Sequence, residues 1–336
     1  MTTANPVSVA LCTHNGERFI GEQLASILDQ THPPAEIVLS DDASGDETVA
    51  RARAVVARFR AERPESTVRL RVLENPVALG VARNFEQAIL ACANELIALS
   101  DQDDIWLPSR LERAVAVFDL RPDLLLLHSD AFLVDESGGR LDATLLQALE
   151  VSDSVQGAIH GGAAFEQLMK RNLVTGATTM IRRRLLDWAI PFPAEWVHDE
   201  WLAIVAAAVG ELEVLPDPLI SYRQHASNQI GARRLSVLGK FRRLMEPGTG
   251  RNRRLLDRAT VLANRLPSLG EAVSEARRDA ARHKVVHERM RQGLAANRML
   301  RILPVLRELG TGRYSEFGRG AVDAARDLLQ PLERDR

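Results

Sequence analysis

The first hundred residues alternate between two hydrophobic periodicities. Short apolar runs occur at 7–12, 36–40, 68–73 and 96–99 and predict buried strands. Between them, apolar residues recur every three or four positions, which predicts helices over about 17–28, 47–59 and 85–93. Strand and helix alternate in this way in a doubly wound α/β sheet whose strands are mainly parallel.

The rest of the chain predicts a second part of this sheet and then a helical region. Residues 124–128, 131–134 and 174–181 read as strands, 141–170 as mainly helical, and 199–209 as an apolar helix ended by Gly210. After residue 231 the sequence becomes rich in Arg and Leu at helical spacing. We therefore expect an α/β domain over 1–235 and a helical C-terminal region over 236–336.

Composition adds few constraints to this picture. The chain has 336 residues, of which 46% are hydrophobic and 26% charged, as in ordinary globular proteins. No apolar stretch reaches the roughly 18 residues that a transmembrane helix needs. The first twelve residues lack the features of a signal peptide, so we expect a cytoplasmic protein. Cys12 and Cys92 lie in apolar runs without metal-binding spacing and are expected to be reduced core thiols.

The net charge of −2 hides an uneven distribution of charge. Residues 236–336 carry 22 Lys and Arg against 12 Asp and Glu, which leaves 21 basic and 33 acidic residues in the rest. A basic tail suits an anionic partner such as the inner membrane surface, with Leu235, Leu238, Phe241 and Leu244 as contacts. A solvated helical face explains the same charges. Nucleic acid is not expected, because aromatic content is only 4%.

Polar clusters follow the predicted strands directly. In a doubly wound sheet, ligands bind beyond the carboxyl ends of the strands. Thr13, Asn15 and Glu17 follow the first strand and can cradle a nucleotide or form an ordinary turn. Asp41 and Asp42 follow the second and can bind a ribose or base, or cap the next helix. The shared location predicts one site at this edge.

The fourth strand runs into the acidic sequence Asp101-Gln102-Asp103-Asp104. Crowded carboxylates repel one another unless a cation lies between them. Mg²⁺ or Mn²⁺ would relieve this repulsion and can also hold a diphosphate. A solvated acidic turn is the alternative interpretation.

Three further residues are candidates for chemistry. Asp199 stands at a predicted helix start, where it can act as a general base or only interact with the helix dipole. Arg223 can pair with a diphosphate, and His225 can be a metal ligand or a structural residue.

Five sequence blocks together resemble family 2 glycosyltransferases of the GT-A fold, and are most similar to bacterial rhamnosyltransferase-like members. The blocks are CTHNGERFIGEQLASILDQT, EIVLSDDASGDET, ALSDQDDIWLP, HDEWLA and YRQHASNQIGA, within residues 6–235. The resemblance implies a GT-A type doubly wound, mixed but mainly parallel sheet with a C-terminal helical extension. It also implies an inverting, metal-dependent enzyme of surface polysaccharide synthesis.

The resemblance assigns roles to individual residues. Asp101 and Asp103 correspond to the two acids of the DxD motif, with Asp103 as metal ligand and Asp101 nearer the ribose. Asp199 matches the base of an acidic motif that here reads His-Asp-Glu, and His225 takes the place of a late metal or diphosphate ligand. The residues implied for the nucleoside pocket are Thr13, Asn15, Glu17, Asp41 and Asp42.

The resemblance also implies the reaction partners. The donor is a nucleoside diphosphate sugar, with dTDP-rhamnose as one candidate, and the acceptor is a glycan or a lipid-linked sugar. Mn²⁺ or Mg²⁺ is the implied cofactor. Arg83 lies in a loop that helps to bind the donor, and residues 176–179 match a segment near the acceptor.

Three other functions fit the sequence less well. A non-catalytic nucleotide-sugar-binding scaffold would keep the nucleoside residues and need no base. A sugar-phosphate nucleotidyltransferase usually carries a Gly-rich, basic loop after its first strand, which THNGERF lacks. A dehydrogenase is not expected, because no GxGxxG follows that strand.

Overall fold

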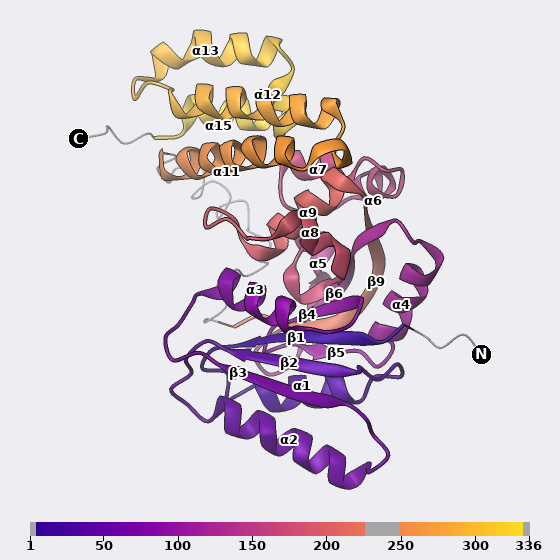
Figure 1. The fold of residues 1–336 in the computed structure, drawn as a ribbon. Helices are drawn as coiled ribbons and strands as arrows, with labels where there is room; N and C mark the ends of the chain where they lie inside the picture. The colour runs from indigo at the N-terminus through magenta and orange to yellow at the C-terminus, as the bar shows by residue number, and fades with distance from the viewer. Residues whose placement is uncertain (1–4, 226–248, 332–336) are drawn as a thin grey trace. The chain divides into compact units, whose positions relative to one another are not determined.

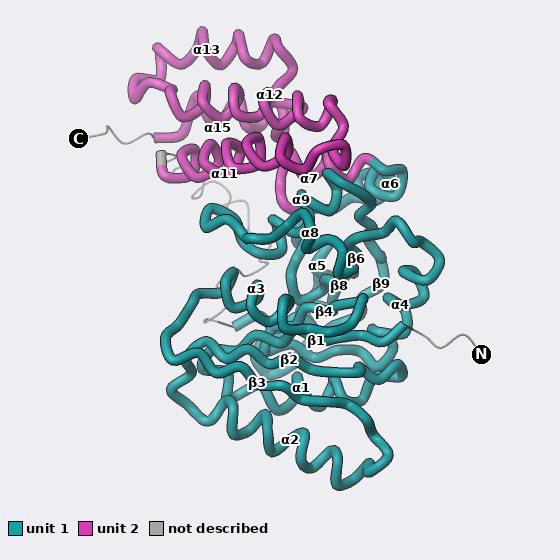
Figure 2. The backbone as a smooth tube through the Cα atoms, viewed as in Figure 1, with its two compact units in different colours: residues 1–162, 173–232 teal, residues 163–172, 233–336 magenta. Residues whose placement is uncertain are grey.

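The computed structural model describes residues 5–225 and 249–331. The chain forms two compact units (Figure 2). The first comprises residues 1–162 and 173–232, and the second comprises 163–172 and 233–336. Composition predicts a single boundary near residue 235. Contacts also place the short segment 163–172 in the second unit.

The first unit is built on one mixed sheet with the strand order β3-β2-β1-β4-β8-β6-β9-β5. Its indigo and violet half in Figure 1 is parallel and contains β1 (Val7–Thr13), β2 (Glu36–Asp41), β3 (Arg69–Glu74) and β4 (Leu96–Ser100). β1, β2 and β4 are buried on both faces, as their continuous apolar runs predict. β3 is the edge strand and carries Arg69, Arg71 and Glu74, charges that discourage pairing with another chain.

Helices connect these parallel strands. They are α1 (Ile20–Leu28), α2 (Thr48–Glu62) and α3 (Val81–Ala91). A fourth helix, α4 (Arg110–Leu120), lies after the last of these strands in the sequence. In α1 the buried apolar residues Ile20, Leu24, Ile27 and Leu28 repeat at helical spacing and form one face. The alternation of strands and helices predicted from the sequence is confirmed for this half.

The second half of the sheet is mainly antiparallel, but its long strands β6 (Leu124–Val134) and β9 (Glu211–Arg223) pair in parallel. β5 (Ile105–Trp106), β7 (Arg140–Thr144) and β8 (Thr179–Arg182) complete it. The two strands expected at 124–128 and 131–134 are one continuous strand, because Ser129 and Asp130 are buried within β6 and do not form a turn.

The remaining elements of the first unit are short helices and one long one. They are α5 (Leu145–Ala148), α6 (Asp153–His160), η1 (Gly176–Thr178), η2 (Arg183–Leu185), α8 (Leu186–Ala189) and α9 (His198–Val209). The strand expected over 174–181 was wrong in its first half. Residues 176–178 form a 3₁₀ turn there, and β8 begins only at Thr179.

The core of the first unit lies between the sheet and these helices. Val9, Leu11, Ile37, Leu39 and Ala98 are fully buried on the strands. Cys12 and Cys92 are free and buried, which confirms the expected core thiols, and burial raises the pKa of Cys92 to about 12. This rigid sheet fixes the positions of the loops at its carboxyl edge.

The second unit contains α7 (Ala164–Lys170), α11 (Thr249–Ser268), η3 (Gly270–Ala272), α12 (Glu275–Gln292), α13 (Arg298–Gly310), α14 (Arg313–Phe317) and α15 (Ala321–Leu329). Its apolar cluster is small and includes Leu294, Val305, Tyr314 and Ala324. Within residues 5–225 and 249–331, no helix is long and apolar enough to cross a bilayer.

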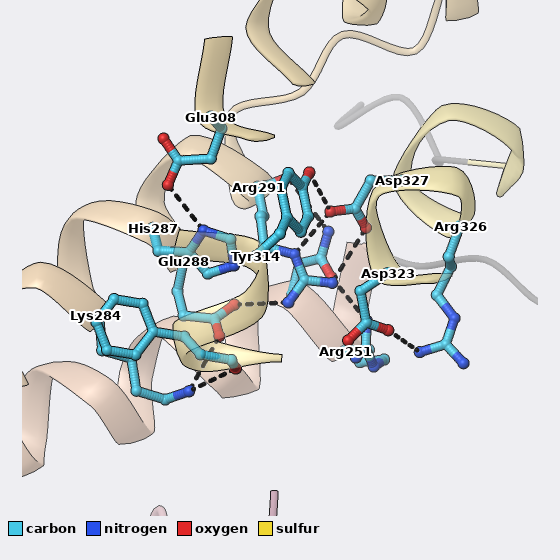
Figure 3. A network of polar contacts seen from close by, with 12 residues as sticks. Arg251, Lys284, His287, Glu288, Arg291, Glu308, Tyr314, Asp323, Arg326 and Asp327 are labelled. Carbon is cyan, nitrogen blue, oxygen red and sulfur yellow. Dashed lines mark hydrogen bonds and ion pairs between the residues drawn. The ribbon is translucent and has the colours of Figure 1, made fainter. Parts of the chain in front are cut away.

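A buried polar network holds the helices of the second unit together (Figure 3). Arg291 of α12 pairs with Asp327 of α15 through two hydrogen bonds of 2.7 and 3.1 Å. The Tyr314 hydroxyl donates to the same carboxylate at 2.9 Å. Glu288 accepts from Arg291, and His287 pairs with Glu308 of α13 at 2.8 Å. Each buried acid of this network therefore faces a basic or donor group.

Candidate active site

The carboxyl ends of β1, β2 and β4 meet at one edge of the sheet. β1 lies between the other two, with Thr13 opposite Asp41 and Leu11 opposite Ser100. The loops that follow these strands contain most of the polar residues singled out in the sequence. The structure brings these loops together, as the alternation of strands and helices predicts.

The loop after β1 is tied to the start of α2. The Thr13 hydroxyl donates to Asp41 at 2.7 Å. Asn15 has a φ of 48°, a left-handed conformation that Asn tolerates better than most residues, and its Oδ1 accepts from the Gly45 amide at 2.9 Å. Glu17 Oε2 accepts from the Glu47 amide at 3.1 Å. These polar residues give the loop a defined shape.

Gln102 joins the loop after β1 to the acidic loop after β4. Its Oε1 accepts from the His14 amide at 2.8 Å, and its Nε2 donates to the His14 carbonyl at 3.1 Å. A Cβ atom at Gly16 would lie 2.1 Å from Gln102 Oε1, so a larger residue there would displace the Gln102 side chain. Sequence reasoning did not identify Gln102 or Gly16. Their only signal was a polar residue inside an acidic run and a glycine in a turn.

Asp41 and Asp42 shape the loops around the second strand end. Asp41 accepts from the amide and hydroxyl of Ser44 at 2.8 and 2.6 Å. Asp42 accepts from the amides of Leu79 and Gly80 at 2.6 and 2.9 Å, which holds the loop before α3. Both side chains are thus engaged by neighbouring loops. Arg83, in the first turn of α3, pairs with Glu86 and remains half exposed.

The acidic loop after β4 brings Asp101, Asp103 and Asp104 together without equal positive charge. Burial, then the charges of Asp103 and Asp199, raise the pKa of Asp101 to about 8, while Arg110 opposes this shift. Burial, then the charges of Asp103 and Asp101, also raise the pKa of Asp104 well above its usual value. Asp199 therefore belongs electrostatically to the same acidic cluster, although it lies far away in the sequence.

The end of β9 closes against this acidic loop. His225 Nε2 lies 2.7 Å from Asp103 Oδ2, and the ring stacks on Phe19 with centroids 5.1 Å apart. The Arg223 guanidinium donates to the Asp103 carbonyl at 2.8 Å. It also reaches Glu22 at 2.7 Å and the Glu136 carbonyl at 2.8 Å. The predicted residues Asp103, Arg223 and His225 therefore form one contiguous group.

Asp104 and Arg110 are buried residues next to this group. Asp104 Oδ1 accepts from the Arg223 amide at 3.0 Å, which fixes the backbone of β9 to the acidic loop. Asp104 Oδ2 and Arg110 Nη1 are buried and have no hydrogen-bond partner within the described part of the chain. Arg110 stacks on Trp106 at 3.6 Å, and burial lowers its pKa to about 9. Arg110 was not identified from the sequence.

Asp199 lies at the start of α9 with both carboxylate oxygens hydrogen-bonded. Oδ2 accepts from the Gly176 amide and Oδ1 from the Glu200 amide, each at 2.8 Å. The preceding His198 stacks on Phe85 with centroids 3.9 Å apart, and burial lowers its pKa to about 3. Gly176, from the segment that the sequence placed near an acceptor, thus contacts the candidate base directly.

The donor set at this site suits a hard divalent cation that is partly held by a substrate. Among the described residues, no group of three or more His, Cys, Asp or Glu side chains is arranged to hold a metal ion. Asp103 and His225 nevertheless place an oxygen and a nitrogen 2.7 Å apart. They lie near Asp101, whose pKa is raised by burial and by neighbouring acids. Mg²⁺ commonly uses one or two carboxylates, with phosphates and waters completing its shell. The residues present therefore fit such an ion.

The chain matches curated relatives, several of them over less than two thirds of their own length. The chain is 27% identical over 268 residues to the dTDP-rhamnosyl transferase RfbG of Shigella flexneri, covering 76% of this chain and 84% of that protein. It is 25% identical over 203 residues to the UDP-Glc:alpha-D-GlcNAc-diphosphoundecaprenol beta-1,3-glucosyltransferase WfgD of Escherichia coli, covering 59% and 69%. An uncharacterized glycosyltransferase of Nostoc is 26% identical, and the alignment covers 66% of each protein.

Solved structures share the fold. S. aureus TarS 1–349 in complex with UDP-GlcNAc has a TM-score of 0.57 at 17% identity, covering 96% of this chain and 88% of that one. The GT-A type fold with a helical C-terminal region is thereby confirmed. Residues 8–187 match the family described as Glycosyl transferase family 2. That match spans more than half of the chain, and this protein belongs to glycosyl transferase family 2.

Proposed function

We propose that this protein transfers a sugar from a nucleoside diphosphate donor to an acceptor hydroxyl in the synthesis of a surface polysaccharide. The observation that carries the proposal is the convergence of Asp103, His225 and Arg223 beside the acidic cluster of Asp101 and Asp199. This convergence lies at the carboxyl edge of the sheet, in a chain of glycosyl transferase family 2. In this proposal, Arg223 and a metal held by Asp103 and His225 bind the diphosphate, and Asp199 is the base.

The donor in this proposal is a nucleoside diphosphate sugar. The names of the relatives give UDP-glucose for WfgD and dTDP-rhamnose for RfbG, and the TarS structure contains UDP-GlcNAc. Rhamnose is the sugar of one relative at 27% identity and is our first choice. In this proposal, the loops that hold Thr13, Asn15 and Glu17 form the nucleoside pocket. Asp41 and Asp42 complete it, and Arg83 contacts the donor from α3.

A divalent metal, Mn²⁺ or Mg²⁺, completes the proposed donor site. Asp103 and His225 would hold it, with Asp101 alongside, and a mannosyltransferase of Pyrobaculum calidifontis with a TM-score of 0.50 was solved with GDP-Man and Mn²⁺. When bound, the ion supplies positive charge to the departing nucleoside diphosphate. Arg223 would pair with the diphosphate in place of Glu22, its present partner at 2.7 Å.

Asp199 is the proposed general base. Its two backbone hydrogen bonds and its position at the N-terminus of a twelve-residue helix stabilise the ionised carboxylate. A carboxylate at this position would act by accepting the proton of an acceptor hydroxyl. A single base with no nucleophile fits direct displacement, which inverts the configuration at the sugar carbon. Glu200, the next acid, is the alternative base.

The acceptor in this proposal is a growing glycan or a lipid-linked sugar. WfgD is named for a diphosphoundecaprenol-linked substrate, which is a lipid. The basic C-terminal region would then contact the inner membrane surface. The apolar residues first considered for this contact, Leu235, Leu238, Phe241 and Leu244, lie outside the described residues.

Release of nucleoside diphosphate from a panel of donor sugars tests the proposal. Wild type would be assayed with Mn²⁺, with Mg²⁺ and after chelation, beside Asp103→Ala. Metal-dependent release from one donor, lost in the variant, is the expected result and names the donor. Donor binding without release, even when a crude lipid or glycan acceptor extract is added, would favour the non-catalytic scaffold. Absence of donor binding would contradict the proposal.

A further inference from the structure

Helix α13 of the second unit exposes an apolar face. Met299 is 73% exposed, and several neighbouring aliphatic side chains are also open to solvent. The exposed apolar residues of the helix are Met299, Leu300, Ile302, Leu303, Leu306 and Leu309. At 100° per residue, Met299, Leu303 and Leu306 lie at the centre of this face and the other three at its borders. We call these six residues the α13 apolar face.

The opposite side of the helix is buried through polar contacts. Arg301 donates to the carbonyls of Ala295, Ala296, Asp327 and Gln330 at 2.5 to 3.1 Å. Glu308 pairs with the buried His287 at 2.8 Å. These contacts fix the rotation of the helix about its axis. The apolar face is therefore held outward by the fold, which is the reverse of an ordinary surface helix.

Charge and area distinguish a lipid surface from a second protein copy. The exposed charged residues of α13 are Arg298 and Arg307, whereas its acid Glu308 is buried. Two copies packed through this face would bring like charges together. The face is limited to one side of a helix of 13 residues, whereas a stable dimer usually buries about 800 Å² on each partner. An apolar helix face bordered by arginines matches the anionic headgroups and acyl chains of a bilayer.

We infer that the α13 apolar face docks on an anionic lipid surface, with the helix lying in the plane of the interface. Leu303, Leu306 and Met299 enter the acyl boundary, and Arg298 and Arg307 contact lipid phosphates. The α13 apolar face would be the surface through which the protein makes the membrane contact of the proposed function. The biological purpose of this docking rests on that function. The docking itself involves neither donor nor metal, so it can be tested without the transfer reaction.

Vesicle binding by the full-length protein tests this inference. Sedimentation would compare phosphatidylcholine vesicles with vesicles containing 30% phosphatidylglycerol, without donor or metal. The double variant Leu303→Ser, Leu306→Ser removes the centre of the face. The double variant Arg298→Gln, Arg307→Gln removes its charge, and at about 1 kcal/mol per basic residue should weaken partitioning about tenfold or more. Leu120→Ser, at an 83% exposed leucine of α4 in the first unit, is the matched control.

The expected result is binding to anionic vesicles that falls at least tenfold in both double variants and is unchanged in Leu120→Ser. Far-ultraviolet circular dichroism checks that the variants stay folded. Absence of binding to either vesicle, or equal binding by the leucine variant, would overturn the inference. A concentration-dependent dimer abolished by Leu303→Ser, Leu306→Ser without vesicle binding would assign the face to a second copy. Failure of the donor assay alone would leave vesicle binding unaffected.

Discussion

The two units of this protein treat buried carboxylates in opposite ways. In the second unit, burial alone would raise the pKa of Asp323, but Arg319 and Arg291 lower it below its usual value. In the first unit, burial and neighbouring acids raise the pKa of Asp101 to about 8 and raise that of Asp104 well above its usual value. The polar network of the second unit supplies its buried acids with partners, whereas the loop after β4 in the first unit gathers acids and leaves them short of positive charge.

This difference separates a structural network from a site. A paired buried charge stabilises the arrangement of helices, and removal of either partner strands the other. An acid cluster with raised pKa values costs stability and is typical of functional sites. The sequence contains both sets of acids, but only the three-dimensional partners distinguish them. We expect substitutions in the two units to change activity and stability separately.

The largest expected effect is on activity at Asp199. Asp199→Asn keeps the shape of the side chain but cannot take the acceptor proton, so kcat should fall by about 10² to 10⁴. Glu200→Gln is the matched control and should retain kcat within a few-fold. Both would be measured as sugar transfer at saturating donor. The reverse pattern would assign the base to Glu200, and equal activity of both variants with wild type would remove the base from the mechanism.

The largest expected effect on stability lies in the second unit. Asp327→Ala strands the buried Arg291 guanidinium and the Tyr314 hydroxyl, and should destabilise this unit by about 3–5 kcal/mol. Native-state hydrogen exchange of α12 and α15 measures this loss. Glu275→Ala removes an exposed ion pair with Arg282 and should lower stability far less, because solvent screens the pair. Similar losses in the two variants would show that burial of the network contributes nothing.

A pH effect of intermediate size is expected at His198. Its folded pKa of about 3 lies below the ordinary value of 6.5, so the unfolded chain binds the proton first as pH falls. Stability from this residue is therefore present above pH 6.5 and is lost as pH falls toward 3. Between pH 7 and pH 5, wild type should lose about 2 kcal/mol more than His198→Phe, which keeps the stacking on Phe85. Urea unfolding at the two pH values measures this difference, and equal losses would contradict it.

The smallest expected effect is at Asp101, where a substitution should stabilise the protein, whereas the substitution at Asp327 destabilises it. The folded pKa of Asp101 is raised, so the folded state of the metal-free protein is increasingly disfavoured as pH rises from about 4 to about 8. Asp101→Asn removes this penalty and should raise the free energy of unfolding at pH 8 by about 1 kcal/mol or more. Urea unfolding with chelator measures it. A destabilised variant would mean that Asp101 is already compensated within the protein.

Much of the fold and the location of the site could be predicted from the sequence. Continuous apolar runs followed by polar residues placed Thr13, Asp41 and Asp101 at neighbouring strand ends. The link of Asp103 to His225, 122 positions apart, followed only from the resemblance to a family. Periodicity identifies an element and the edge at which it ends, but it does not give distances between residues far apart in the chain.

Other features depend on contacts that leave no pattern in the sequence. Gln102 joins two loops through the backbone of His14, which any polar residue in a turn could do. In α13, helical spacing predicts the helix but assigns its leucines to the interior. The structure instead buries Arg301, because several carbonyls from other parts of the unit converge on it. The roles proposed for individual site residues stay predictions.

Calorimetric titration of Mn²⁺ into the metal-free protein tests most directly whether the acids of the first unit require a cation. Wild type, Asp103→Asn and Asp327→Asn would be compared in the presence of UDP and of dTDP. We predict that wild type binds Mn²⁺ and that one of these nucleotides strengthens the binding. Asp103→Asn should not bind the ion, whereas folded Asp327→Asn should bind it with the affinity of wild type. Equal Mn²⁺ binding by wild type and Asp103→Asn, or none by wild type with either nucleotide, would contradict the account.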